Sequence, residues 1–209
     1  MIWLCLFAIL LITAETALVT RFPALLRNFR YQSFCLALLT ALAAYHEKSL
    51  ELCLIALLLF ILKVILIPHL FSVMMKKIGT NEHIGLFLNT NISLLIVIVL
   101  GLISWFFAFS IVSVYLMQFT LGLAFFMMLT GIFLMVSRIK ALAQVIGLLL
   151  TENGIFLAAT VIPGGMPFFV EIALFFDILI SLMILGIFIY RINAIFTHID
   201  VNKLSGLRG

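Results

Sequence analysis

Three charged side chains stand near the middle of long apolar stretches: Lys63, Glu152 and Asp177. A charge at the depth of lipid tails is energetically costly, faces protein or water, and commonly marks a path for ions or protons. Desolvation in general brings the pKa values of carboxyl groups and lysines toward neutrality, and a nearby opposite charge shifts each back. These residue types at this depth therefore predict proton transfer along a buried polar layer.

The composition places these charges in a membrane protein. Of the 209 residues, 66% are hydrophobic and 10% are charged, and the mean hydropathy is +1.39. Continuous apolar runs of about 18 residues or more recur along the chain, and each can cross a hydrocarbon core about 30 Å thick. The net charge of +4 lies in connections and predicts no nucleic-acid partner. No metal-ligand cluster is expected from the three dispersed cysteines, Cys5, Cys35 and Cys53.

We predict an all-α, polytopic transmembrane bundle of about seven helices. The predicted spans are 2–20, 31–45, 51–75, 84–110, 112–137, 139–161 and 168–190. The second span is short and must borrow flanking residues or tilt. The uncharged stretch 84–136 is about 80 Å long as a helix, too long for one crossing, so we expect a break near 110–113. Pro68 should kink the third helix and free the carbonyl four residues back.

Basic residues gather on every second connection, which predicts how the chain is oriented. The basic residues of these connections and of the C-terminal end are Arg21, Arg27, Arg30, Lys76, Lys77, Arg138, Lys140, Arg191, Lys203 and Arg208. The positive-inside rule then predicts an outside N-terminus and a cytoplasmic C-terminus in the inner (cytoplasmic) cell membrane. We divide the chain into four N-terminal helices, 1–111, and a three-helix module with a cytoplasmic tail, 112–209.

Helix rise gives the depth of each charge. Glu152 and Asp177 each lie about 14 Å below the predicted outer ends of their helices, and Lys63 lies about 18 Å deep. The three groups share one layer near the bilayer midplane. We predict that Glu152 and Asp177 are relay carboxylates, with Lys63 as their charge partner or a third relay group.

Three further polar residues each have a functional and a structural interpretation, and a fourth has a structural role only. Glu15 is a candidate for proton uptake or release, or it reaches toward Arg21 at the interface. Glu171 is a similar candidate, or it simply reaches the outer interface. His69 is an interior histidine with satisfied hydrogen bonds, or a further relay group. Asn153, beside Glu152, is expected to hydrogen-bond across helices.

The stretch 138–156 resembles a known family. It carries a basic residue, Arg138, before a helix and a glutamate, Glu152, at mid-depth. The same pattern of a basic residue followed by a mid-depth glutamate is found in the small K-type subunit shared by respiratory complex I and multisubunit cation/proton antiporters. Asp177, in Leu174-Phe-Phe-Asp-Ile-Leu, matches a second mid-membrane carboxylate of that family, where glutamate is usual. Aspartate is one methylene shorter than glutamate, which puts the geometry of the proton path in question but not the role of Asp177 in it.

Four additional helices before this module extend the resemblance. Together with Thr151-Glu-Asn-Gly154, the Lys63 helix with its Pro68, and the tail that begins Asp200-Val-Asn, they closely resemble component E of hydrogenase-4 and of related membrane-bound nickel–iron hydrogenases or formate hydrogenlyase-like complexes. The resemblance is specific from about Arg138 onward and weak before the Lys63 helix.

The resemblance implies a non-catalytic membrane subunit of a group 4 nickel–iron hydrogenase or complex I-like respiratory assembly that takes part in proton translocation. Such a subunit holds no redox cofactor of its own, and the nickel–iron and iron–sulfur centres are expected in partner subunits. The implied partners are antiporter-like membrane subunits, hydrogenase-type peripheral subunits and the lipid bilayer. The tail is expected to dock onto a neighbouring subunit, or to be a solvated end.

Other functional classes remain open. The chain could be the equivalent small subunit of a cation/proton antiporter, without redox partners. A self-contained transporter is less favoured, because paired helices interrupted by glycine or proline in corresponding halves are missing. An independent membrane enzyme is disfavoured, since the histidines are scattered and no nucleophile–base or metal-ligand set is present. A purely structural scaffold predicts that neutralising the midplane charges has no effect.

Overall fold

The computed structural model describes residues 1–78 and 90–161; the predicted helix at 168–190 lies outside these ranges. The described residues are helical and contain no β-strand. The elements are α1 (Ile2–Leu18), α2 (Phe22–Glu47), α3 (Leu50–Leu59), the π-helical segment η1 (Phe60–Leu66), α4 (Ile67–Ile78), α5 (Thr90–Ile111), α6 (Tyr115–Ser137) and α7 (Ala141–Ala159). The predicted break between two crossings is confirmed, because α5 ends at Ile111 and α6 begins at Tyr115.

Four of these helices are long and apolar enough to cross a membrane. They are Leu50–Met75, Asn91–Ile111, Tyr115–Ser137 and Ala141–Ala159. The helix Ile2–Leu18 is apolar but shorter. The protein is thus all-helical over its described residues and has helices that can span a membrane by their length and composition, as the sequence predicts. The total of seven spans and their orientation stay predictions.

The helix α2 differs most from its prediction. It runs over 26 residues, Phe22–Glu47, rather than 31–45, so the predicted connection over 21–30 is wrong. Pro23 suits the first helical turn, where its missing N–H has no intrahelical partner. The first turns bury one apolar stripe and leave Arg27 and Arg30 exposed. The members of the stripe are Phe22, Leu25, Leu26 and Phe29. Average hydropathy concealed this amphipathic start.

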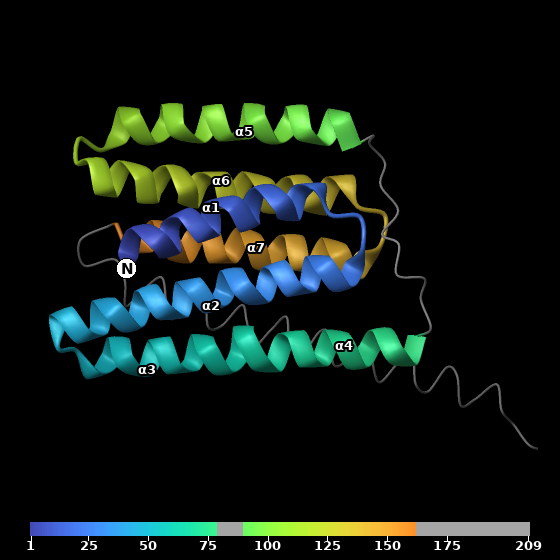
Figure 1. The fold of residues 1–209 in the computed structure, drawn as a ribbon, viewed down its shortest axis with the longest axis horizontal. Coiled ribbons are helices and arrows are strands. Elements are labelled where there is room, and N and C mark those ends of the chain that lie inside the picture. The colour runs from blue at the N-terminus through green and yellow to red at the C-terminus, as the bar shows by residue number, and fades with distance from the viewer. Residues whose placement is uncertain (79–89, 162–209) are drawn as a thin grey trace, which may run out of the picture.

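The helices lie side by side along one direction, with α1, α2, α6 and α7 at the centre (Figure 1). α6 packs along α7 and also contacts α1, whereas α2 contacts α1, η1 and α7. α5 covers the outer side of α6, and the rod of α3, η1 and α4 covers the outer side of α2. Two apolar clusters fill the spaces between these helices. The interior is therefore enclosed from both sides.

Glycines bring the backbones of α6 and α7 into contact. A Cβ atom on Gly147 would lie 2.7 Å from the carbonyl oxygen of Gly131. A Cβ atom on Gly154 would lie 2.8 Å from the carbonyl oxygen of Ala124. Small residues allow this approach between membrane helices. The glycine face of α7 meets α6, and another face is left for α2 and η1.

The rod containing Lys63 is interrupted by η1. In this π segment the N–H of Ile67 donates to the carbonyl of Leu62, five residues back. Pro68 follows directly and has no N–H to continue the helical ladder. A π segment of this kind is rare and is frequently found at functional sites. Lys63 lies in its middle.

Candidate functional site

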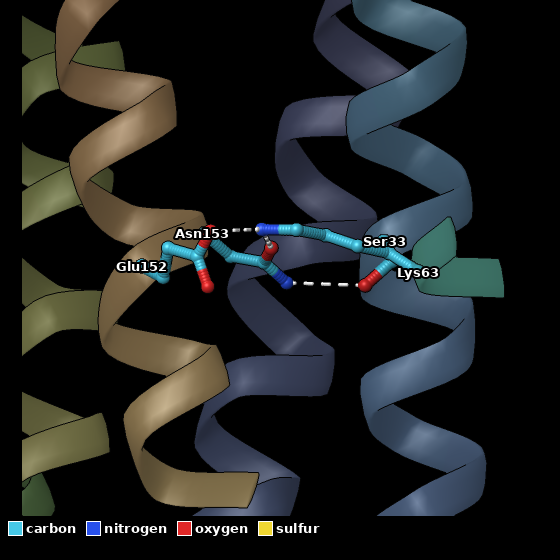
Figure 2. Close-up of polar contacts among 4 residues, drawn as sticks. All are labelled: Ser33, Lys63, Glu152 and Asn153. Carbon is cyan, nitrogen blue, oxygen red and sulfur yellow. Dashed lines mark hydrogen bonds and ion pairs between the residues drawn. The ribbon is translucent and has the colours of Figure 1, made fainter. Parts of the chain in front are cut away.

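A buried ion pair lies at the centre of the bundle, between η1 and α7. The Nζ atom of Lys63 is 3.1 Å from Oε1 of Glu152 (Figure 2). The two residues are 1% and 6% exposed. The depth argument from the sequence placed these charges in one layer, and the structure brings them into contact.

Asn153 joins this pair to a third helix. The Nζ atom of Lys63 donates a hydrogen bond to Oδ1 of Asn153 at 3.0 Å. The Nδ2 atom of Asn153 in turn donates to Oγ of Ser33 on α2 at 3.1 Å (Figure 2). The predicted hydrogen bonding of Asn153 across helices is therefore confirmed. We call Ser33, Lys63, Glu152 and Asn153 the polar cluster.

The polar cluster has the chemistry of a proton-exchange site. An ammonium and a carboxylate in contact can pass one proton between them, which turns the ion pair into a neutral amine and a carboxylic acid. Burying two charges away from water is costly, and the attraction between the ammonium and the carboxylate offsets part of that cost. The side-chain oxygen of Asn153 accepts from the Lys63 ammonium, and its side-chain nitrogen donates to Ser33. These two hydrogen bonds fix the position of the Asn153 amide.

A second polar contact lies beside the cluster, between α1 and α2. The Nε2 atom of Gln32 donates to Oγ1 of Thr13 at 2.6 Å, and Thr13 donates to the carbonyl of Ile9 at 2.6 Å. Sequence reasoning missed both Ser33 and Gln32. A signal was present, because Asn28 and Gln32 lie four residues apart in α2 and share a helix face that is buried.

Arg138 ties the connection between α6 and α7 to the end of α1. Its side chain is fully buried, and Nη2 donates to the carbonyl of Ala17 at 2.9 Å. This contact satisfies one of the carbonyl groups that a helix end leaves without an intrahelical partner. Burial lowers the pKa of the Arg138 guanidinium to about 10. The basic residue singled out by the family resemblance thus has a positioning role for α7.

The other predicted site residues lie elsewhere. Glu15 is half-exposed and lies 3.8 Å from Arg27, rather than reaching toward Arg21. His69 is exposed, so its interpretation as an interior histidine is wrong. Asp177 and Glu171 lie outside the described residues. Within 1–78 and 90–161, no group of three histidine, cysteine, aspartate or glutamate side chains could hold a metal ion.

Over the described residues, the chain is a bundle of helices, four of them long and apolar enough to cross a membrane, with a charged pair in its interior. Among curated proteins, the uncharacterized protein Rv0085 of Mycobacterium tuberculosis is 34% identical over 85 residues. The match covers 41% of this chain and 39% of that protein, so it spans about two fifths of the relative's length. No family model matches the chain. No solved structure matches it.

Proposed function

We propose that the chain is a non-catalytic membrane subunit of a group 4 nickel–iron hydrogenase or complex I-like assembly, and that it helps carry protons. The observation that carries this proposal is the buried pair of Lys63 and Glu152, held by Asn153 inside the bundle. Stability alone is a weak reason to keep such a pair, because apolar residues of similar volume are often at least as stabilising. A role that needs movable charge accounts for it better.

In this proposal, Glu152 and Asp177 are relay carboxylates and Lys63 is the group that exchanges a proton with Glu152. Transfer from the ammonium to the carboxylate removes the attraction between the two side chains. The charged pair forms again when the Glu152 carboxylic acid releases its proton to the next relay group and the Lys63 amine takes up another proton. The chain spans the inner membrane with an outside N-terminus, and it contacts antiporter-like subunits, while partner subunits hold the redox centres.

Purification from native membranes tests the assembly. The full chain, tagged at its N-terminus and extracted in mild detergent, should bring with it a nickel–iron catalytic subunit, iron–sulfur proteins and antiporter-like subunits. Recovery with antiporter-like subunits alone would assign the chain to a cation/proton antiporter instead. Recovery without any partner would contradict both assemblies.

Proton transport tests the site separately. The intact complex is placed in vesicles, and proton movement is followed with a pH-sensitive dye. Glu152→Gln and Asp177→Asn should each abolish transport while the complex still assembles. The matched control is Glu51→Gln, which neutralises an exposed carboxylate in the first turn of α3 and should leave transport unchanged. Full transport in both site variants would exclude the relay.

A further inference from the structure

A groove lies on the surface of the helix bundle, between the first half of α2 and the junction of η1 with α4. Its volume is about 600 Å³. One wall is formed by residues of α2, and the other by residues of η1 and α4. The lining residues that matter for its chemistry are Arg27, Arg30, Tyr31, Ile65, His69 and Ser72.

Two arginines make this groove strongly positive. Arg27 and Arg30 are exposed and lie three residues apart on α2, so their side chains emerge on neighbouring turns. Glu15 lies 3.8 Å from Arg27 and offsets part of its charge, but both side chains are more than half exposed, so this ion pair is weak and leaves Arg27 able to bind another anion. No aspartate or glutamate is found among the described residues that line the groove. Two exposed guanidinium groups in one groove can therefore bind an anionic partner.

The position of the arginines along α2 fits the lipid headgroup region. Arg27 and Arg30 lie about 8 and 12 Å from the first residue of the helix. Side chains on a helix lean toward its N-terminus, and long basic side chains extend toward the interface. The Arg27 guanidinium can therefore approach the level at which α2 begins, beside the connection that joins it to α1, and Arg30 follows about 5 Å farther along the helix.

We propose that the groove binds the headgroup of an anionic phospholipid. The phosphate lies between Arg27 and Arg30, because a guanidinium group can donate two parallel hydrogen bonds to phosphate oxygens. Tyr31, His69 and Ser72 supply further polar groups around the headgroup. Apolar side chains of the same groove, Leu26 and Ile65, face the beginning of an acyl chain. Basic pockets between membrane helices bind anionic lipids by this chemistry.

The site lies next to the segment that carries Lys63. Ile65 belongs to η1 and Pro68 is the second residue of α4, and both line the groove. A bound lipid would therefore contact the same stretch of helix that positions the buried ammonium, from its outer side. The binding site itself does not depend on the proposed proton path, since it rests on the groove and its charges.

Lipid binding to the purified full chain tests this inference. The protein in mild detergent is titrated with phosphatidylglycerol or with phosphatidylcholine, and bound lipid is counted by native mass spectrometry. Phosphatidylglycerol should bind more tightly. The double variant Arg27→Gln with Arg30→Gln should weaken the binding of phosphatidylglycerol about thirtyfold. Each basic residue near an anionic lipid surface raises the affinity about fivefold, and the two factors multiply.

Controls separate the groove from overall charge. The double variant Arg21→Gln with Lys48→Gln removes the same number of exposed positive charges outside the groove and should change binding less than about twofold. Replacing both groove arginines with lysine keeps the charge, so this variant should still prefer phosphatidylglycerol but bind it more weakly than the arginines do, because an ammonium cannot donate the two parallel hydrogen bonds of a guanidinium. This variant tests the groove even where the glutamine variant does not fold. Equal binding of the two lipids would overturn the proposal. Complete displacement of the lipid by millimolar inorganic phosphate would overturn it as well, in favour of a free-phosphate site.

Discussion

Replacing Lys63 with methionine should destabilise the protein strongly. Lys63 and Glu152 are 1% and 6% exposed, so the small contribution of a surface ion pair does not apply to them. Methionine keeps most of the length of the side chain but removes the positive charge from its place 3.1 Å from the carboxylate. Removing one partner of a buried pair costs about 3–5 kcal/mol in the free energy of unfolding.

A double-mutant cycle isolates the pair. Lys63→Met combined with Glu152→Met should recover much of the loss, because an apolar replacement of both partners is often neutral. The coupling energy between the two positions is then about 2–3 kcal/mol. Unfolding is measured by titrating the protein in mixed micelles with a denaturing detergent and following the fluorescence of Trp3 and Trp105.

The exposed pair of Arg27 and Glu15 provides the matched control. Its atoms lie 3.8 Å apart and both side chains are more than half exposed, so the same cycle should give a coupling of about 0–1 kcal/mol. If Lys63 and Glu152 showed a coupling as small as this control, the buried ion pair would not exist in the folded protein.

Two further substitutions test the contacts that surround the pair. Gly147→Ala should cost about 1–3 kcal/mol in unfolding free energy, because the new methyl group meets a backbone oxygen of α6. In the control Gly101→Ala, the new methyl group meets only a ring atom at 3.7 Å, so this change should cost less than about 1 kcal/mol in the same titration. Asn153→Leu should cost about 2 kcal/mol by removing two buried hydrogen bonds, whereas Asn91→Leu, at an exposed position of α5, should change stability by about 0.5 kcal/mol or less. Equal effects of either substitution and its control would contradict the packing described here.

The contact between Lys63 and Glu152 could be anticipated because a membrane makes depth readable. Each helix has a fixed rise, and its ends are marked by charged connections or by proline and glycine, so the level of a residue follows from counting. For Asn153 the sequence predicted a hydrogen bond across helices but not its partners, Lys63 and Ser33, which the structure identifies. The roles of these groups in proton transfer, and that of Asp177, are predictions that contacts alone do not decide.

Other features could not be obtained from hydropathy. The first turns of α2 contain two arginines, and their average polarity concealed the buried stripe that begins at Phe22. The π segment depends on how the carbonyls before Pro68 are arranged, which a proline in the sequence does not specify. The glycines of α6 and α7 were uninformative until the two helices were placed together, because close contact is a property of the pair.

The two sides of the buried pair are supported in different ways. Glu152 projects from a helix whose backbone is in contact with that of α6 through Gly131, Gly147 and Gly154, so a rotation or a slide of α7 would force main-chain atoms together. Lys63 projects from a π segment in an outer rod, where hydrogen bonding is less regular. Glu152 is thus the anchored member of the ion pair, and Lys63 is the member whose backbone can shift more easily. A change in the distance between the two groups requires least rearrangement if it begins in η1.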